Sequence, residues 1–281
     1  MLFRSHRPGP PLSNFVENLW LYEGYDSPGH RERILPSGTF ELVVNLRSDE
    51  LRIYRTVRPD ECLRLSGAIV SGPYGGYFVT DAAEEAAVMG VHFKPGGGFA
   101  FLGSRTDELA DRHIDLDAVW GRWAAELREQ LLETASPSSR LSKLEALLVS
   151  RLVCRRERHC AVSLALDRLA QTGVRTRTRD LSRLVGLSQK RFIDIFRSQV
   201  GLPPKLFHRV VRFQRVLTKV NARSAPDWGE LALDNGYFDQ SHLIRDFLAF
   251  SGFGPDDYLH RLRELDNRGL HVKFNHLPLT R

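Results

Sequence analysis

The C-terminal part of the chain contains an internal repeat, which constrains the fold more than any other feature of the sequence. The first copy, LSRLVGLSQKRFIDIFRSQVGLPPKLF, spans 181–207, and the second, LALDNGYFDQSHLIRDFLAFSGFGPDDYL, spans 231–259. Gly186 corresponds to Gly236, and further glycine, proline and aromatic positions recur after a one-residue insertion. A repeat of this kind indicates one supersecondary unit used twice.

The first copy has the signals of a short helix, a tight turn and a longer helix. Leu181–Val185 is the expected first helix, and Gly186 lies where a helix ends with a positive φ. Ser188 is the expected N-cap of the second helix, which should run to about Val200. Gly201 then closes that helix.

The second copy has the same order of signals. Asp227 is the expected cap of its first helix, and Gly236 is the expected turn. Asp239 should cap a second helix that buries Leu243 and Phe247. Helix–turn–helix units place their second helix in the major groove of DNA, so two of them in tandem favour a DNA-binding protein.

The charge distribution agrees with that interpretation. Residues 175–219 hold 12 Lys or Arg and 2 Asp or Glu, a net charge of +10, whereas the first 173 residues carry −2. A block this basic indicates a polyanionic partner, although a solvated charged face is the alternative. A linking helix at about 204–219, roughly 24 Å long, should join the two units. Residues 220–264 carry −4, so the first copy and the linking helix are expected to supply most of the DNA affinity.

The region before the repeat is expected to be β-rich and then helical. Within Thr39–Leu46, apolar residues alternate with polar ones, and Gly/Pro turns punctuate residues 12–102. We therefore predict a β-sandwich or cupin-like domain with appended helices after about 105. The fold class is α+β, with an all-α C-terminal domain of two helix–turn–helix units joined by a long helix.

These patterns divide the chain into four parts. The predicted parts are a sensor or oligomerisation domain at 1–153, a connecting helix and linker at 154–178, a DNA-binding domain at 179–264 and a tail at 265–281. The pattern assigns no structure to HVKFNHLP at 271–278.

Residues 180–259 resemble the DNA-binding domain of AraC/XylS-type transcriptional regulators, a family of bacterial-type regulators. The residues that carry the resemblance are Leu181, Gly186, Leu187, Ser188, Phe192, Phe196, Gly201, Pro204, Phe207, Leu231, Ala232, Gly236, Tyr237, Gln240, Ser241, Phe247, Gly252, Pro255 and Tyr258. The N-terminal region resembles the sensor domains of some relatives through LPSGTFELVVNL and GVHFKPGGGFAFLG. The resemblance implies two recognition helices about 34 Å apart on one face of DNA. It also implies an N-terminal domain that changes how the DNA-binding domain is presented.

The exposed positions of the two recognition helices are the candidate DNA contacts. The expected base-facing residues are Gln189, Lys190, Ile193, Asp194, Gln240, Ser241 and Arg245. The expected phosphate contacts are Arg191, Arg197, Lys205, Arg209, Arg212, Arg215 and His242. The alternatives are that Asp194 pairs with a neighbouring basic residue, that His242 is a surface histidine and that several of the basic residues are merely solvated.

Other kinds of site have little support in the sequence. Glu41, Asn45 and His92 are candidate polar residues of a ligand pocket, and the aromatic residues around them suit either a pocket or an ordinary core. Cys154 and Cys160 lack the second ligand pair of a zinc site, although a thiol sensor is an alternative. We expect no metal, no cofactor and no enzymatic activity.

The predicted function is that of a sequence-specific transcriptional regulator that responds to a small molecule or partner through its N-terminal domain. The alternative is a constitutive DNA-binding protein whose N-terminal domain only mediates oligomerisation. Expected partners are double-stranded DNA, a small-molecule effector, a second copy of the chain and RNA polymerase, with no membrane. The N-terminus lacks the apolar stretch of a signal peptide, so a cytoplasmic location is expected.

Overall fold

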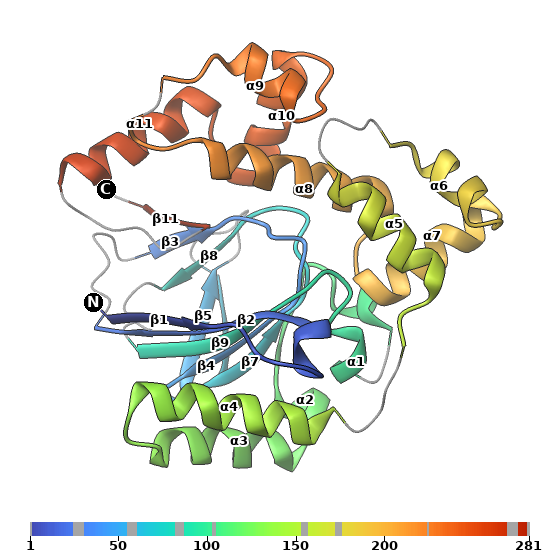
Figure 1. Cartoon of the computed structure of the whole chain (residues 1–281). Coiled ribbons are helices and arrows are strands. Elements are labelled where there is room, and N and C mark those ends of the chain that lie inside the picture. Colours follow the sequence, from blue (N-terminus) through green and yellow to red (C-terminus); the bar gives the residue numbers. More distant parts are fainter. Residues whose placement is uncertain are drawn as a thin grey trace.

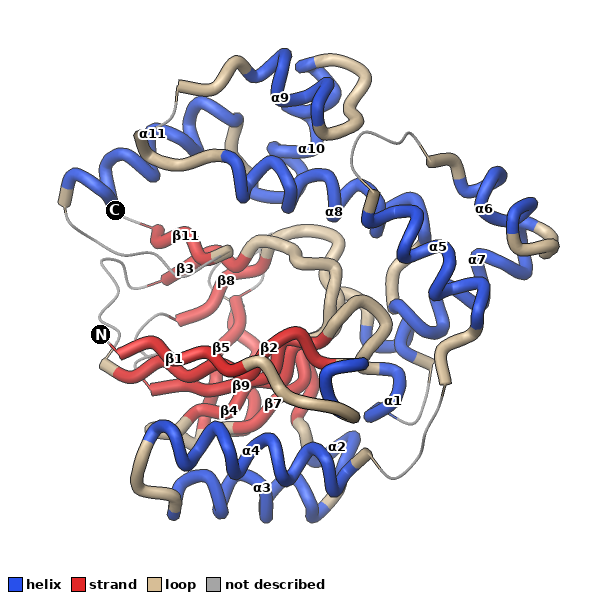
Figure 2. Tube along the Cα trace, in the orientation of Figure 1, coloured by secondary structure: helices blue, strands red, loops and turns tan. Residues whose placement is uncertain are grey.

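The computed structural model describes residues 2–24, 31–54, 61–81, 87–102, 105–152, 157–171, 176–223, 225–268 and 275–279. Its described part is an α+β structure with two antiparallel sheets, built mainly from the N-terminal half, and with helices in the C-terminal half (Figure 1). The colouring by secondary structure in Figure 2 separates the strands from the helices that surround them. The α+β fold class is therefore confirmed.

The strands of the described part form two sheets. The first sheet has the order β1-β2-β9-β4-β7-β10, and the second has the order β11-β3-β8-β5-β6. The strand bounds are β1 Leu2–His6, β2 Val16–Glu23, β3 Arg31–Ile34, β4 Glu41–Asn45, β5 Glu50–Tyr54, β6 Cys62–Ser66, β7 Ala68–Ser71, β8 Phe78–Asp81, β9 Ala87–Phe93, β10 His113–Asp115 and β11 His276–Leu279. Three of these strands, β1, β10 and β11, lie outside the range 12–102 in which strands were predicted.

Helices cover the first sheet and make up the C-terminal part. The helix bounds are α1 Phe99–Leu102, α2 Asp117–Trp120, α3 Arg122–Glu133, α4 Pro137–Arg151, α5 Cys160–Ala170, α6 Thr178–Leu184, α7 Gln189–Val200, α8 Pro204–Lys219, α9 Trp228–Asp234, α10 Gln240–Ser251 and α11 Pro255–Asn267, with 3-10 helices η1 Leu12–Asn14 and η3 Thr106–Leu109.

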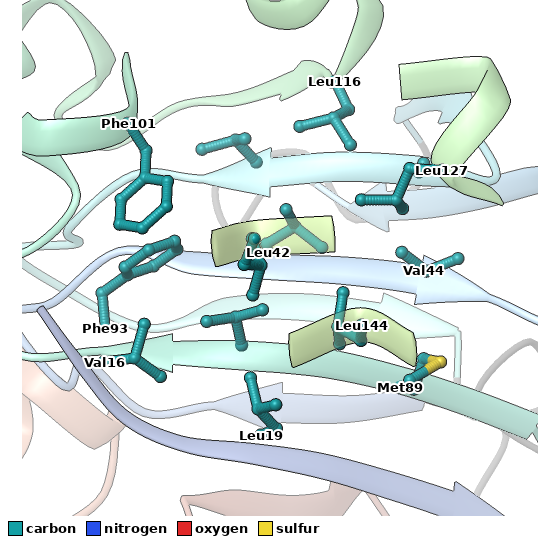
Figure 3. Packing of buried hydrophobic residues seen from close by; sticks show 14 of the residues in the cluster. Val16, Leu19, Leu42, Val44, Met89, Phe93, Phe101, Leu116, Leu127 and Leu144 are labelled. Atoms are coloured by element: carbon teal, nitrogen blue, oxygen red, sulfur yellow. The ribbon is translucent and has the colours of Figure 1, made fainter. Parts of the chain in front are cut away.

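The first sheet has one face against helices α3 and α4 and the other face against the second sheet. Leu42 and Val44 of β4 are fully buried on the helix side with Leu127 and Leu144 (Figure 3). The predicted alternation places Glu41 of β4 on the opposite side, between the sheets. Because side chains alternate along a strand, one strand serves both layers.

Helices α7 and α8 have the predicted bounds, whereas α6 begins at Thr178, three residues before the predicted first helix. Gly186 and Gly236 have φ values of 68° and 79°, so both turns use the left-handed region that glycine permits. Ser188 Oγ accepts from the backbone N–H of Arg191 and caps α7, and Asp239 caps α10. The two units therefore repeat the same capped turn.

The linking helix α8 lies between the second unit and the N-terminal sheets. Val210 and Phe213 of α8 are fully buried in a cluster that includes Leu35 from the N-terminal half. The side-chain amide of Gln214 donates to the carbonyl of Pro36 at 2.6 Å. The helical part and the β-rich part thus share a hydrophobic core.

The end of the chain returns to the second sheet. Strand β11 pairs antiparallel with β3, and His276 lies opposite Ile34. Leu277 is fully buried in the same cluster as Leu35. The tail segment 271–278, to which the pattern assigned no structure, therefore contributes a strand to an N-terminal sheet. Its residues 271–274 lie outside the described residues.

Candidate functional site

The first recognition helix, α7, exposes its N-terminal turn. Gln189, Lys190 and Arg191 are all exposed at that end. Ile193, predicted to face bases, is half-buried and packs against the core of the first unit. The exposed polar residues of this turn are therefore the most accessible to a polyanion. Only part of the Ile193 side chain is accessible for contact with bases.

The middle of α7 is held by the segment that precedes β10. Arg105 Nη2 donates to Asp194 Oδ1 at 2.9 Å, and Arg197 Nη2 lies 3.5 Å from Asp107 Oδ2. Thr106 is fully buried and donates its hydroxyl to the carbonyl of Ser198 at 3.0 Å. The segment 105–107 thus contacts one predicted base-facing residue and one predicted phosphate contact.

Asp194 adopts the ion-paired alternative, since its other carboxylate oxygen lies 3.5 Å from Arg191 Nη1. The hydrogen bond and the positive charge of Arg105 lower the pKa of Asp194, and the charges of Arg191 and Arg197 lower it by smaller amounts. The carboxylate is therefore ionised and engaged within the chain. The pairing with Arg105 competes with acceptance from a cytosine amino group.

The second recognition helix, α10, exposes three of its predicted contacts. Gln240, Ser241 and Arg245 are exposed along one face of the helix. His242 is half-buried and meets the ring of Tyr237 edge-on at 5.3 Å. Burial, followed by the charge of Arg212, lowers the pKa of His242, so a charged contact from His242 to phosphate is disfavoured near neutral pH.

Two arginines of α8 turn inward to a buried carboxylate. Asp246 is almost fully buried, and Arg209 and Arg212 both pair with it, at 2.8 and 3.5 Å. Arg212 also donates to the carbonyl of Gly236 at 3.0 Å and lies over the ring of Tyr237. Arg212 is itself buried, so its position corrects the prediction that it contacts phosphate.

The other predicted phosphate contacts differ in their exposure. Lys205 is exposed near the start of α8. Arg215 is half-buried and donates to the carbonyl of Leu169 at 2.7 Å. The exposed basic residues among the predicted contacts are therefore concentrated around α7, the beginning of α8 and Arg245 of α10.

A cavity of about 320 Å³ lies between the two sheets. Glu41 and His92, both predicted pocket residues, line it together with Thr39. His92 Nδ1 lies 3.3 Å from Glu41 Oε1, and its Nε2 lies 3.3 Å from Thr39 Oγ1. Burial alone would lower the pKa of His92, but the hydrogen bond and charge of Glu41 outweigh it and raise that pKa.

Asn45 does not belong to the lining of this cavity. Its side-chain oxygen accepts from the backbone N–H groups of Arg47 and Ser48 at 2.9 and 2.8 Å. Asn45 therefore caps the turn between β4 and β5, which corrects its prediction as a pocket residue. Asparagine is a common turn former, so an asparagine at the end of a strand is compatible with either a pocket residue or a turn.

The prediction from sequence did not include His113, the most unusual residue of the cavity. Both nitrogens of its ring are buried and lack a hydrogen-bond partner within the described residues, and burial lowers its pKa to about 3. Its ring packs against those of Tyr74 and Phe78, at centroid distances of 4.8 and 4.5 Å. His113 follows a polar segment with no strand pattern, so only the pairing of β10 with β7 reveals its position.

Within the described ranges, no group of three or more His, Cys, Asp or Glu side chains is arranged to hold a metal ion. His159 caps α5 through its Nδ1, and Cys160 beside it is exposed. Cys154, the other candidate thiol, lies outside the described residues. No helix among the described residues is long and apolar enough to span a bilayer.

Two family models match separate parts of the chain. Residues 181–261 match a family described as a helix-turn-helix domain, and residues 4–115 match one described as a domain of unknown function (DUF6597). No curated protein sequence matches the chain.

Solved structures of ToxT from Vibrio cholerae are similar over most of the chain. An apo variant of ToxT has 10% identity and a TM-score of 0.47, and the match covers 87% of this chain and 97% of that one. ToxT of strain O395 has 10% identity and a TM-score of 0.44, with 92% and 98% covered. ToxT bound to an unsaturated fatty acid has 8% identity and a TM-score of 0.44, with 96% and 98% covered.

Proposed function

Since the chain carries a helix-turn-helix domain of the AraC type at 181–261, preceded by a DUF6597 domain, we propose that it is a sequence-specific transcriptional regulator. In this proposal the two units bind successive major grooves of one DNA site. The N-terminal domain responds to a small molecule that occupies the cavity between its sheets.

The observation that carries the proposal is the tandem of capped recognition helices. In both units the helix after the turn begins with a side-chain cap and exposes polar residues in its first turn. Gln189 and Lys190 provide these groups in the first unit, and Gln240 and Ser241 provide them in the second, with Arg245 exposed further along α10. Glutamine suits adenine, and arginine or lysine suits guanine, so both helices have the chemistry for reading bases.

Phosphate contacts would come from a smaller set of residues than the net charge suggests. Arg191 and Lys205 are exposed and are the leading candidates, with Arg197 joining them if it leaves Asp107. Arg209 and Arg212 are committed to Asp246, so the linking helix contributes less than its sequence indicates. Most of the affinity would then come from the first unit and the first turn of α8.

Regulation would operate through the two places where the N-terminal domain meets the helical part. Ser71 lines the cavity and pairs with His113, which follows the segment that contacts α7. Asn275 and His276, which follow the DNA-binding domain in the chain, also line the cavity. A ligand between the sheets would therefore touch segments connected to both helix–turn–helix units.

Selection of bound duplexes from a random pool, at two salt concentrations, tests the proposal. We expect a bound site of about 15–20 base pairs with two preferred clusters one helical turn apart, because both units engage one face. Arg245→Ala should relax the preference in one cluster, and Lys190→Ala should relax it in the other. Arg7→Ala, at an exposed arginine near the N-terminus, is the matched control and should leave both clusters unchanged.

A site much shorter than about 15 base pairs would contradict simultaneous use of both units. Binding without any sequence preference would contradict the proposal as a whole. A preferred site whose affinity never changes when the cavity is filled would favour the alternative, a constitutive DNA-binding protein. In that case the N-terminal domain would serve only in oligomerisation.

A further inference from the structure

The cavity between the sheets concentrates polar atoms that have no partner. The described residues contain ten buried side-chain nitrogen or oxygen atoms without a hydrogen-bond partner. Five of these atoms belong to four residues that line the cavity, namely Asn18, Trp20, His113 and Asn275. Buried polar atoms are nearly always satisfied in folded proteins, so this concentration indicates a group that completes the site.

The unpartnered groups mainly accept hydrogen bonds. The side-chain oxygens of Asn18 and Asn275 are acceptors, and a neutral His113 has one acceptor and one donor nitrogen. Trp20 contributes the remaining donor, its indole N–H. Since acceptors outnumber donors, the complementary ligand donates more hydrogen bonds than it accepts.

The charged groups that line the cavity also favour a ligand that donates hydrogen bonds. Among the described lining residues, Glu17 and Glu41 carry carboxylates, and none is Lys or Arg. His92 is already paired with Glu41. His276 Nδ1 likewise lies 2.8 Å from Glu32 Oε2. An anionic ligand would therefore meet no Lys or Arg among the described lining residues. An amine or amide could instead donate to the unpartnered side-chain oxygens of Asn18 and Asn275, and could share the Glu41 carboxylate with His92.

The size and walls of the cavity suit a compact, mainly apolar ligand body. An engineered apolar cavity of about 150 Å³ holds one benzene ring, so about 320 Å³ accommodates a compound of about two fused rings. Tyr74 and Phe78 provide aromatic walls next to His113. Ile34 and Val43 add aliphatic surface. Such walls favour stacking and apolar contact over a long polar chain.

We propose that this cavity binds a compact aromatic ligand of about two rings whose polar end is an amine or amide and not a carboxylic acid. The inference deepens the proposed function, on which it rests only for the role of this ligand as the effector. The binding chemistry itself depends on the cavity alone.

Three probes with one ring system test the inference on the full chain at pH 7.5. Isothermal titration calorimetry should give dissociation constants for tryptamine and indole-3-acetamide at least ten-fold lower than for indole-3-acetate. Glu41→Gln should weaken the binding of tryptamine more than that of indole-3-acetamide, since only the amine carries a positive charge that the carboxylate stabilises. Equal or tighter binding of the acid, or no measurable binding of any probe, overturns the inference.

Cavity-filling variants locate the site. Val43→Trp should abolish binding of both favoured probes, whereas Val149→Trp, at an exposed position of α4, should bind them as the unchanged chain does. Ile69→Phe is the second filling variant, to be used if circular dichroism shows that Val43→Trp does not fold. Binding that persists in a folded filling variant would overturn the inference, because the probes would then occupy another site.

Parallel measurement of DNA affinity by fluorescence anisotropy separates the two proposals. Binding of the amine and amide by a chain that binds no DNA would overturn the proposed function and leave the ligand class intact. DNA binding by a chain that prefers the acid would do the reverse.

Discussion

Arg105 donates a 2.9 Å hydrogen bond to Asp194, and this bond connects the start of η3 in the N-terminal part to the first recognition helix. The sequence leaves two roles open for Asp194, contact with a base or an ion pair with a basic neighbour. In the structure the neighbour that pairs most closely comes from 89 residues earlier in the chain, not from α7 itself. The contact therefore makes α7 a shared element of both domains.

Removal of Arg105 should raise affinity for DNA. In Arg105→Ala, Asp194 loses its partner from the N-terminal domain, while the Thr106–Ser198 hydrogen bond and the Arg197–Asp107 pair remain. The middle of α7 is then held less firmly and adjusts more easily to the groove. An ion pair this open to solvent contributes little, so we expect a gain of at most about five-fold. Fluorescence anisotropy with a selected duplex measures the change.

Arg112→Ala controls for the loss of positive charge near this contact. Arg112 is exposed, and its guanidinium donates to the carbonyl of Glu108 rather than to α7. We expect its affinity for DNA to stay within two-fold of the unchanged chain. A gain of equal size in both variants would show that the Arg105–Asp194 bond does not restrain α7.

Arg212→Ala should destabilise the fold strongly. Removing one partner of a buried ion pair leaves an uncompensated charge, at a cost of about 3–5 kcal/mol. Asp246 keeps Arg209 as a second partner, so we expect the lower part of that range. Urea denaturation measures the loss, and Arg245→Ala, at an exposed position of α10, should change the free energy of unfolding by less than about 0.5 kcal/mol.

The opposite order of effects would mean that Arg212 acts at the surface after all. In that event Arg212→Ala would retain stability and lose affinity for DNA. The combination of stability and binding data therefore decides between the structural role seen here and the predicted phosphate contact.

His113 should make stability fall in mild acid. Its folded pKa is about 3, below the ordinary value of 6.5, so the unfolded chain takes up a proton at a pH where the folded chain does not. The stabilisation is complete above pH 6.5 and is lost at about 1.4 kcal/mol per pH unit as the pH falls toward 3.

Replacement of His113 by glutamine should therefore flatten the dependence of unfolding free energy on pH between 6.5 and 4.5. His260→Gln is the matched control, since the side chain of His260 is 73% exposed. Identical pH profiles for His113→Gln and the unchanged chain would contradict the burial of a neutral imidazole at this position.

The C-terminal strand should contribute to the stability of both domains. Leu277 is fully buried, and truncation of such a leucine to alanine costs about 2–5 kcal/mol because a cavity remains. Leu279→Ala, at a half-buried position of the same strand, should cost clearly less. Chemical denaturation of both variants compares the two, and similar small losses would indicate that β11 leaves the sheet in solution.

The sequence alone predicted the elements whose signals are local. Ser188, Asp227 and Asp239 cap the helices they were expected to cap, and Gly186 and Gly236 have the positive φ expected at the turns. These features depend on residues a few positions apart, so the pattern contains the information needed to place them. The alternation around β4 also identified its two faces.

Only the tertiary structure determined which charged and polar groups remain available for binding. Arg212 has the same sequence pattern as an exposed arginine, but a carboxylate 34 residues later draws it inside. The partners of Asp194, His113 and β11 likewise come from distant parts of the chain. Local preference sets where a helix begins, whereas burial and pairing between distant residues decide which of its side chains can meet DNA or a ligand.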